Sequence, residues 1–174
     1  IEGTLFGAHK SVAGEVVFNT GMMGYPETLT DPSYTGQILV LTYPLVGNYG
    51  VPSMDKKFDS FSNADKIIKY FESDKIQITA LIVSEESEAY NHWNADESLD
   101  SWLKRHNVPG LYGIDTRALT KILREHGTML GKIEVGEHKV KYYNPDVDNL
   151  ISKVTPKQAE FYGSGKKRIL LIDC

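Results

Sequence analysis

The turn Asp31-Pro32-Ser33-Tyr34 carries the side chain best placed to bind a ligand. A residue before proline is held extended, so the turn is fixed and presents the Ser33 hydroxyl and the Tyr34 ring. A hydroxyl on a rigid turn can donate to a carboxylate or accept from an ammonium group at small entropic cost. Serine after proline is most often an ordinary turn residue, so the local pattern by itself favours a plain turn over a ligand contact.

The residues before this turn have several special backbone requirements. A strand is predicted from Glu15 to Thr20, with Val16 and Phe18 on one face. Gly21 and Gly24 then permit backbone angles that a side chain would forbid. A stretch with so many constrained positions is expected to shape a surface, so Tyr25 is counted among the residues of this surface.

A second glycine and aromatic cluster contains Tyr43-Pro44 and Gly47-Asn48-Tyr49-Gly50. It has no Lys-Ser pair and opens no amphipathic helix, which excludes a phosphate-binding loop. We predict that this loop packs beside Tyr25 and the turn of residues 30–34. Gly47 and Asn48 would then shape an interface, although simple loop packing is equally compatible with the pattern.

Other residues with possible chemistry lack the partners that the chemistry requires. The histidines show no i, i+3 or i, i+4 pair and no accompanying cysteine or carboxylate cluster, so no metal site is expected at His9, His92, His106, His126 or His138. Glu15 and Asp31 have no third group to support an acid–base role. Trp93 and Trp102 lack interleaved basic residues for stacking nucleobases and are expected to be core or interface aromatics.

The elements that must position these residues begin with strands. Short β-branched and apolar runs predict strands at Thr4 to Phe6, Gln37 to Thr42 and Gly131 to Val135. The run from Ile76 to Val83 is apolar on both faces, with Ile78, Ala80 and Ile82 on one of them, and is therefore expected to be central in a sheet.

Three helices are predicted. The first covers 64–73 after an Asn63 cap, with its apolar stripe at Ile67, Ile68 and Phe71. The second has acidic residues at its start and basic residues at its end, and it buries Leu99, Trp102 and Leu103; its charged ends are Asp96, Glu97, Asp100, Lys104, Arg105 and His106. The third begins after Asp115, ends at Gly127 and turns four residues inward: Ala118, Leu119, Ile122 and Leu123.

Composition sets wide bounds on the class of protein. A chain of 174 residues with 41% hydrophobic residues suits one globular domain, and pattern alone gives an α+β or α/β class. No apolar run approaches the roughly 20 residues of a membrane helix. The single cysteine excludes an internal disulfide, and dispersed charges with a net charge of −4 argue against nucleic-acid binding.

Segments across nearly the whole chain match, in order, those of one known family: residues 14–34, 37–44, 47–50, 90–93, 101–103, 108–110, 113–120, 124–132 and 168–174. The chain resembles the amino-terminal domain of the small subunit of carbamoyl-phosphate synthetase, of the eukaryotic multifunctional type in which small subunit and synthetase are fused. The resemblance implies a three-layer β/β/α swivelling domain over residues 1–153, a linker over 154–166, and the first strand of a glutaminase domain over 167–174.

The resemblance also implies a role for this domain. Ser33 would help to bind the L-glutamine substrate of the glutaminase, and the domain would dock the glutaminase to the synthetase without doing chemistry itself. Gly21, Gly24, Tyr25, Asp31, Pro32, Tyr34, Gly47 and Asn48 would shape this site or interface. Amidotransferases use a cysteine nucleophile in a glycine-rich elbow, and Cys174 lies outside such an elbow, so no catalytic residue is expected.

The complete enzyme would use bicarbonate and two ATP molecules, with ATP and Mg bound in the synthetase part and no cofactor in this domain. No nucleic-acid or membrane partner is expected. The preferred interpretation is a cytoplasmic enzyme of pyrimidine synthesis. Residues 39–44 and 48–50 resemble that type, whereas 90–93 and 128–134 equally resemble the mitochondrial, ammonia-dependent type of the urea cycle. A stand-alone swivelling carrier is a further alternative, but none of the histidines lies in the glycine- and threonine-rich turn that a phosphohistidine carrier needs.

Overall fold

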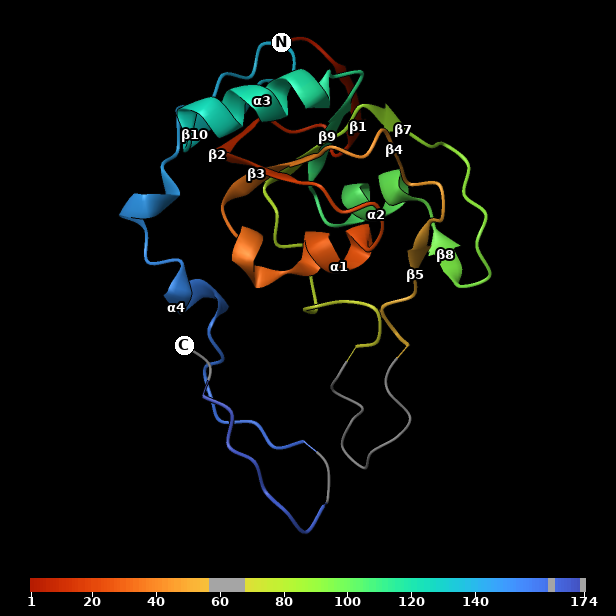
Figure 1. Ribbon diagram of the computed structural model, residues 1–174, viewed down its shortest axis with the longest axis vertical. Coiled ribbons are helices and arrows are strands. Elements are labelled where there is room, and N and C mark those ends of the chain that lie inside the picture. Colours follow the sequence, from red (N-terminus) through yellow and green to blue (C-terminus); the bar gives the residue numbers. More distant parts are fainter. Residues whose placement is uncertain (57–67, 163–164, 173–174) are drawn as a thin grey trace.

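A six-stranded mixed sheet organises the computed structural model, which describes residues 1–56, 68–162 and 165–172 (Figure 1). Four parallel strands lie in the middle, and an antiparallel strand closes each edge. The order across the sheet is β1 (Thr4–Gly7), β9 (Pro109–Tyr112), β6 (Ala80–Ile82), β3 (Gln37–Leu41), β2 (Val12–Asn19) and β10 (Met129–Ile133).

The predicted strands are confirmed, although β2 begins three residues before the predicted start, β10 lies two residues earlier than predicted, and β6 is much shorter. β6 is central as expected, but it covers three residues because the backbone before it bonds outside the ladder, where Gln77 N–H donates to Leu29 O. Ile78 consequently packs on the opposite side of the sheet from Ala80 and Ile82, and the prediction that all three share a face was wrong.

Both faces of this sheet carry apolar side chains, and other elements pack on each face, so that the domain has three layers. On one face α3 (Thr116–His126) packs over Ile38, Val40 and Ile82. On the other face lie α1 (Tyr25–Thr30), α2 (Leu99–Arg105) and two short strand pairs: β4 (Leu45–Val46) with β7 (Glu85–Glu86), and β5 (Val51–Pro52) with β8 (Ala95–Glu97). Figure 1 shows α3 on the side of the sheet opposite α1. The mixed α/β class and the β/β/α order of layers are confirmed, with α1 and α2 added to the layer of short strands.

Helix α3 begins and ends where the sequence predicts. The Asp115 carboxylate accepts from Ala118 N–H at 2.8 Å, and Gly127 ends the helix with φ +76°. Leu123 is buried, but Ala118 is exposed and the Ile122 side chain is 41% exposed. Successive residues turn by about 100° around a helix, so the narrow stripe of Leu119 and Leu123 that meets the sheet directs Ile122 sideways. The prediction that Ala118 and Ile122 point inward was therefore wrong.

The second predicted helix begins later than expected. Ser98 is its N-cap and accepts from Ser101 N–H, whereas Asp96 and Glu97 belong to β8, where backbone pairing with β5 takes precedence over helix formation. The buried stripe is confirmed, because Leu99, Trp102 and Leu103 are fully buried.

The first predicted helix, over 64–73, lies partly outside the described residues. Asn63 to Ile67 lie outside the described residues, and residues 68–73 form a bridge and turns instead of a helix. Tyr70 has φ +70°, which a right-handed helix cannot contain. Ile68 and Phe71 nevertheless pack against the core, as their apolar character predicts.

The C-terminal part begins with two short helices, the 3-10 helix η3 (Pro145–Val147) and α4 (Ile151–Val154). The described chain after α4 forms neither a helix nor a strand. Residues 168–172 form no strand, since no neighbouring strand provides hydrogen-bond partners, and their apolar side chains are exposed. Asp173 and Cys174 lie outside the described residues, and the proposed domain and linker boundaries stay predictions.

Candidate functional site

The turn that contains Ser33 is fixed by local hydrogen bonds. It forms the 3-10 helix η1 (Pro32–Tyr34), whose N-cap Asp31 accepts from Ser33 N–H at 2.8 Å. The Thr35 hydroxyl closes the other end by donating to Pro32 O at 2.8 Å. Ser33 itself is exposed, and its hydroxyl makes no hydrogen bond within the part of the chain that the structure describes. The turn therefore holds a hydroxyl out to solvent on a constrained backbone.

Asn19, which the sequence reasoning overlooked, connects this turn to the glycine-containing turn. Its amide Nδ2 donates to the Tyr34 hydroxyl at 3.0 Å, and its Oδ1 accepts from Gly21 N–H at 2.6 Å. A signal was present, because an asparagine that ends a strand before glycine commonly bonds the backbone two residues further on. The hydrogen bond to Tyr34 joins residues 15 positions apart, so the local sequence around Asn19 could not predict it.

Tyr25 and Tyr49, here called the tyrosine pair, join α1 to the loop of residues 43–50. Their rings stack with centroids 4.3 Å apart. The Tyr49 hydroxyl accepts from Gly24 N–H at 2.8 Å and Tyr25 N–H at 3.1 Å, and the Tyr25 hydroxyl donates to Gly50 O at 2.6 Å. Because the helix N-cap Gly24 has no side chain, the Tyr49 hydroxyl satisfies the backbone N–H groups at the start of α1.

Burial keeps both phenols of the tyrosine pair neutral. Loss of hydration raises the pKa of Tyr25 far above its ordinary value and raises that of Tyr49 as well. The predicted packing of the loop beside Tyr25 is confirmed. No hydrogen bond or ring contact in the described part of the chain joins Tyr49 to Ser33, although Tyr34 packs against the same apolar cluster.

The glycines of the loop serve the close approach of neighbouring backbone. Gly47 has φ +99°, and a Cβ there would lie 3.3 Å from Ser87 O. Asn48 is exposed, and its carbonyl accepts from Asn91 N–H at 3.1 Å. These contacts tie the loop of residues 43–50 to residues 87–94.

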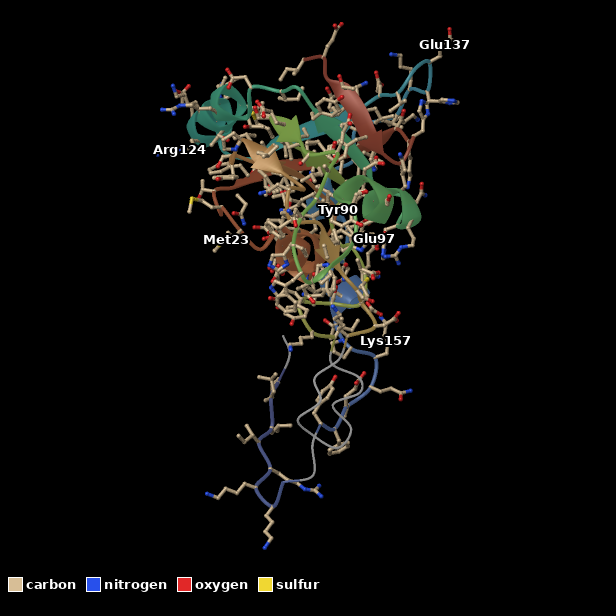
Figure 2. The ribbon with its side chains drawn as sticks, turned by 90° about the vertical axis from the view of Figure 1, so that its right-hand side faces the viewer. Met23, Tyr90, Glu97, Arg124, Glu137 and Lys157 are labelled. Carbon is tan, nitrogen blue, oxygen red and sulfur yellow. The ribbon has the colours of Figure 1, made fainter. Side chains whose placement is uncertain are left out.

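Exposed apolar side chains gather on these loops, which follow the carboxyl ends of the parallel strands β2, β3 and β6. We call this set the carboxyl-edge surface: Met22, Met23, Tyr43, Leu45, Tyr90 and Trp93. Met23 and Trp93 are 80% and 82% exposed, and the His92 ring links Trp93 to Tyr49 with centroid distances of 5.4 and 6.3 Å. In Figure 2, Met23 is labelled at the left edge of the molecule and Tyr90 near the centre of the view. Met22, Met23, Tyr43 and Leu45 line one hollow together, and neighbouring exposed apolar side chains of this kind are typical of a docking surface.

The hollow beside the tyrosine pair is too small for a substrate. Met22, Met23, Asn48 and Tyr49 help to line it, and its volume of about 10 Å³ corresponds to about one water molecule. Trp102 is buried as expected, while the interface role expected for Trp93 stays a prediction.

No catalytic constellation emerges among the described residues. Glu15 accepts from Gln37 Nε2 at 2.8 Å, whereas Asp31 accepts from Ser33 N–H, and no hydrogen bond among the described residues joins the two carboxylates. Burial lowers the pKa of His106, which packs edge-on against Trp102. Within residues 1–56, 68–162 and 165–172, no three metal-ligating side chains converge and no helix is long and apolar enough to cross a membrane.

Comparisons with known proteins give the family. The family model of the carbamoyl-phosphate synthase small chain, CPSase domain, matches residues 1–133. This chain belongs to the carbamoyl-phosphate synthase small-chain family.

Relatives divide between three kinds of enzyme. The chain is 49% identical to the multifunctional protein CAD of Squalus acanthias, covering 99% of this chain and 8% of the relative. It is 48% identical to the arginine-specific carbamoyl phosphate synthase small chain of Saccharomyces cerevisiae, covering 99% and 42%. It is 47% identical to the ammonia-type mitochondrial carbamoyl-phosphate synthase of Mus musculus, covering 100% and 11%. The chain thus spans less than half the length of these relatives.

Proposed function

We propose that this chain is the non-catalytic amino-terminal domain of a glutamine-dependent carbamoyl-phosphate synthetase and that Ser33 contributes to its glutamine pocket. The observation that carries this proposal is the exposed Ser33 hydroxyl, which is held on a fixed turn and has no hydrogen-bond partner in the described part of the chain. A preorganised hydroxyl of this kind suits the charged end of an amino acid, since little side-chain entropy is lost on binding.

The complete enzyme would hydrolyse glutamine in a glutaminase part and pass ammonia to a synthetase part. That part would consume bicarbonate and two ATP molecules, holding ATP and Mg, to make carbamoyl phosphate for pyrimidine synthesis in the cytoplasm. The similarity to a multifunctional protein over 8% of its length supports a domain within a larger enzyme. The carboxyl-edge surface, with Met23 and Trp93 exposed, supports docking to another part of that enzyme.

The Ser33 assignment is tested in the complete enzyme by Ser33→Ala. A hydrogen bond to a charged group contributes about 1.5–3 kcal/mol, so the KM for glutamine should rise about tenfold to a hundredfold. Ammonia enters after the glutaminase step, so ammonia-dependent synthesis should stay nearly unchanged. Steady-state kinetics with each nitrogen donor measure both quantities.

Ser53→Ala controls for the loss of a turn hydroxyl, because the Ser53 hydroxyl, unlike that of Ser33, accepts from a backbone group, Asp55 N–H. It should leave the KM for glutamine unchanged. Equal KM values for glutamine in Ser33→Ala and the parent enzyme would refute the pocket role while leaving the family assignment intact. Small, equal losses with both nitrogen donors would instead indicate a turn residue.

The non-catalytic role is tested on the chain itself. Residues 1–174 should release no glutamate from glutamine above the buffer blank, because the nucleophile and its base belong to another part of the enzyme. Glutamate release that Cys174→Ala abolishes would contradict this expectation and make Cys174 a nucleophile.

The second candidate is the same domain in an ammonia-dependent synthetase. The 47% identity to the mouse ammonia-type enzyme favours it specifically. The two candidates differ in one measurement, which is carbamoyl phosphate synthesis with glutamine as the only nitrogen source. An ammonia-dependent enzyme would show none, and Ser33→Ala would then change no kinetic constant.

A further inference from the structure

Gly36 joins the Ser33 turn to strand β3. Its φ of +83° lies in the left-handed region, which is open to glycine at no steric cost. Because glycine has the least restricted backbone, such a junction lets the turn rotate relative to the sheet unless neighbouring atoms restrain it. The direction of the Ser33 hydroxyl therefore depends on what packs against Gly36.

The sheet restrains one side of this junction. The Gly36 carbonyl oxygen lies so close to β2 that a Cβ at Gly14 would be 2.5 Å from it. The next residue, Gln37, pairs with Glu15 in the parallel ladder of β2 and β3. These contacts fix the end of the junction that enters β3, and the turn side needs restraints of its own.

Three side chains from the C-terminal part of the chain cover Gly36. A Cβ added to it would lie 3.3 Å from Pro145 Cβ, 3.5 Å from Leu150 Cδ1 and 3.6 Å from Tyr143 Cε1. Pro145 is buried, and the other two residues are partly buried. We call residues 143–150 the strap. It fits closely on Gly36, because a side chain at this position would crowd Pro145.

The strap is held in shape by its own hydrogen bonds. The Tyr143 hydroxyl and Lys153 Nζ both donate to Asp148 Oδ2, the latter at 2.7 Å. Asn144 begins η3, and its Oδ1 accepts from Asp146 N–H at 3.0 Å. All of these bonds are local, so the shape of the strap does not depend on the turn that it contacts.

Two further ties limit how far the turn can move. The Tyr34 hydroxyl accepts from Asn19 at 3.0 Å, and the Thr35 hydroxyl lies 3.2 Å from its acceptor, Gln77 Oε1. Neither tie involves the strap. Loosening the strap should therefore displace the Ser33 hydroxyl without releasing the turn, and its effect should be smaller than that of removing the hydroxyl.

We propose that the strap positions the Ser33 hydroxyl by restraining the glycine junction, and that Leu150 is a positioning residue for the glutamine contact. This inference rests on the proposed role of Ser33 and extends it to a residue that would not touch glutamine. Hydrogen bonds weaken steeply as their distance and angle depart from the optimum, so a small rotation at Gly36 is enough to weaken binding.

The test is Leu150→Ala in the complete enzyme. The KM for glutamine should rise about threefold to tenfold, while ammonia-dependent synthesis stays unchanged. Hydrogen exchange followed by mass spectrometry should be faster in a peptide covering residues 31–37, because the N–H groups of residues 33–35 are bonded only within the turn. Leu150→Val, a smaller truncation that also removes Cδ1, should change both quantities in the same direction.

Ile151→Ala is the matched control. Ile151 follows Leu150 directly and is also aliphatic, but it is 67% exposed, whereas Leu150 is partly buried against Gly36. It should leave the KM and the exchange unchanged, and melting curves would verify that each variant folds. The double variant Ser33→Ala, Leu150→Ala should have the KM of Ser33→Ala alone, since an absent hydroxyl cannot be misplaced.

Unchanged exchange in a folded Leu150→Ala variant would overturn the strap. Faster exchange with an unchanged KM for glutamine, in an enzyme whose KM responds to Ser33→Ala, would overturn the positioning role. Additive increases of KM in the double variant would overturn it as well, because Leu150 would then act elsewhere. If Ser33→Ala left the KM unchanged, the glutamine contact itself would fail, and faster exchange in Leu150→Ala would still support the strap as a restraint on the turn.

Discussion

The tyrosine pair and the Ser33 turn differ in how their central hydroxyl groups are used. In the tyrosine pair, three bonds connect positions about 25 residues apart, and both phenols are largely buried. In the Ser33 turn, Asp31 and Thr35 fix the backbone by bonds within residues 31–35. The flanking hydroxyls of Tyr34 and Thr35 also bond to Asn19 and Gln77, and the central Ser33 hydroxyl faces solvent. The first region uses its polar groups to join elements, whereas the second keeps one available for another molecule. Substitutions should therefore reduce stability in the first region and ligand binding in the second.

The largest expected effect is that of Gly50→Ala, in the loop held by the tyrosine pair. Gly50 has φ +66°, and a Cβ there would lie 2.8 Å from Ala95 Cβ and 3.0 Å from Glu97 O. Left-handed strain and overpacking together should lower the free energy of unfolding by about 2–5 kcal/mol, measured by urea denaturation. Gly136→Ala is the control, because Gly136 has φ +60° but a Cβ there would have no neighbouring atom within 4 Å. It should lower the free energy of unfolding by only about 1–2 kcal/mol. Equal losses would show that the loop is not tightly packed.

Tyr49→Phe isolates the hydrogen bonds of the tyrosine pair from its packing. The substitution leaves the N–H groups of Gly24 and Tyr25 without their acceptor and should cost about 1–3 kcal/mol in thermal or urea unfolding. Tyr43→Phe should change stability by less than about 0.5 kcal/mol, since the Tyr43 side chain is 38% exposed and its hydroxyl makes no hydrogen bond in the described part of the chain. If both variants behaved alike, solvent would be replacing the Tyr49 hydroxyl.

Asp31→Ala tests whether the Ser33 turn depends on its own cap. Losing the acceptor for Ser33 N–H should cost about 0.5–2 kcal/mol, within the range measured for N-cap residues. Asp74→Ala removes an exposed carboxylate that has no partner among the described residues and should be neutral within about 0.5 kcal/mol. A neutral Asp31→Ala variant would mean that Pro32 alone fixes the turn.

The smallest effect on stability should be that of Ser33→Ala, within about 0.5 kcal/mol of the parent in urea denaturation, because no described residue loses a hydrogen bond. Thr35→Val, two residues away, should cost about 1 kcal/mol, since its hydroxyl donates to Pro32 O. A destabilised Ser33→Ala variant would remove the contrast between the two regions.

Local signals in the sequence predicted much of the fold. The Asp115 cap, the Gly127 terminator and the doubly apolar run around Leu81 specify conformation within a few residues, and the structure confirms each. The strand pairs β4–β7 and β5–β8 were not predicted, because each strand has only two or three residues and exists through a partner about 40 residues away. For the same reason the sequence missed Asn19 and the capping role of Tyr49, whose bonds are tertiary. The exposed position of Ser33 agrees with a ligand contact, and the contact itself stays a prediction.

The late pairing of the edge strand β1 has a consequence for biosynthesis. Thr4 of β1 pairs with Tyr112 of β9, whereas Glu15 of β2 pairs with Gln37 of β3. At a translation rate of about 5–20 residues per second, β1 waits roughly 5–20 s for its partner to be made, while β2 and β3 can meet much sooner. During that interval the apolar side chain of Phe6, buried in the finished domain, has no sheet to cover it. β1 is thus paired later than strands that are made after it.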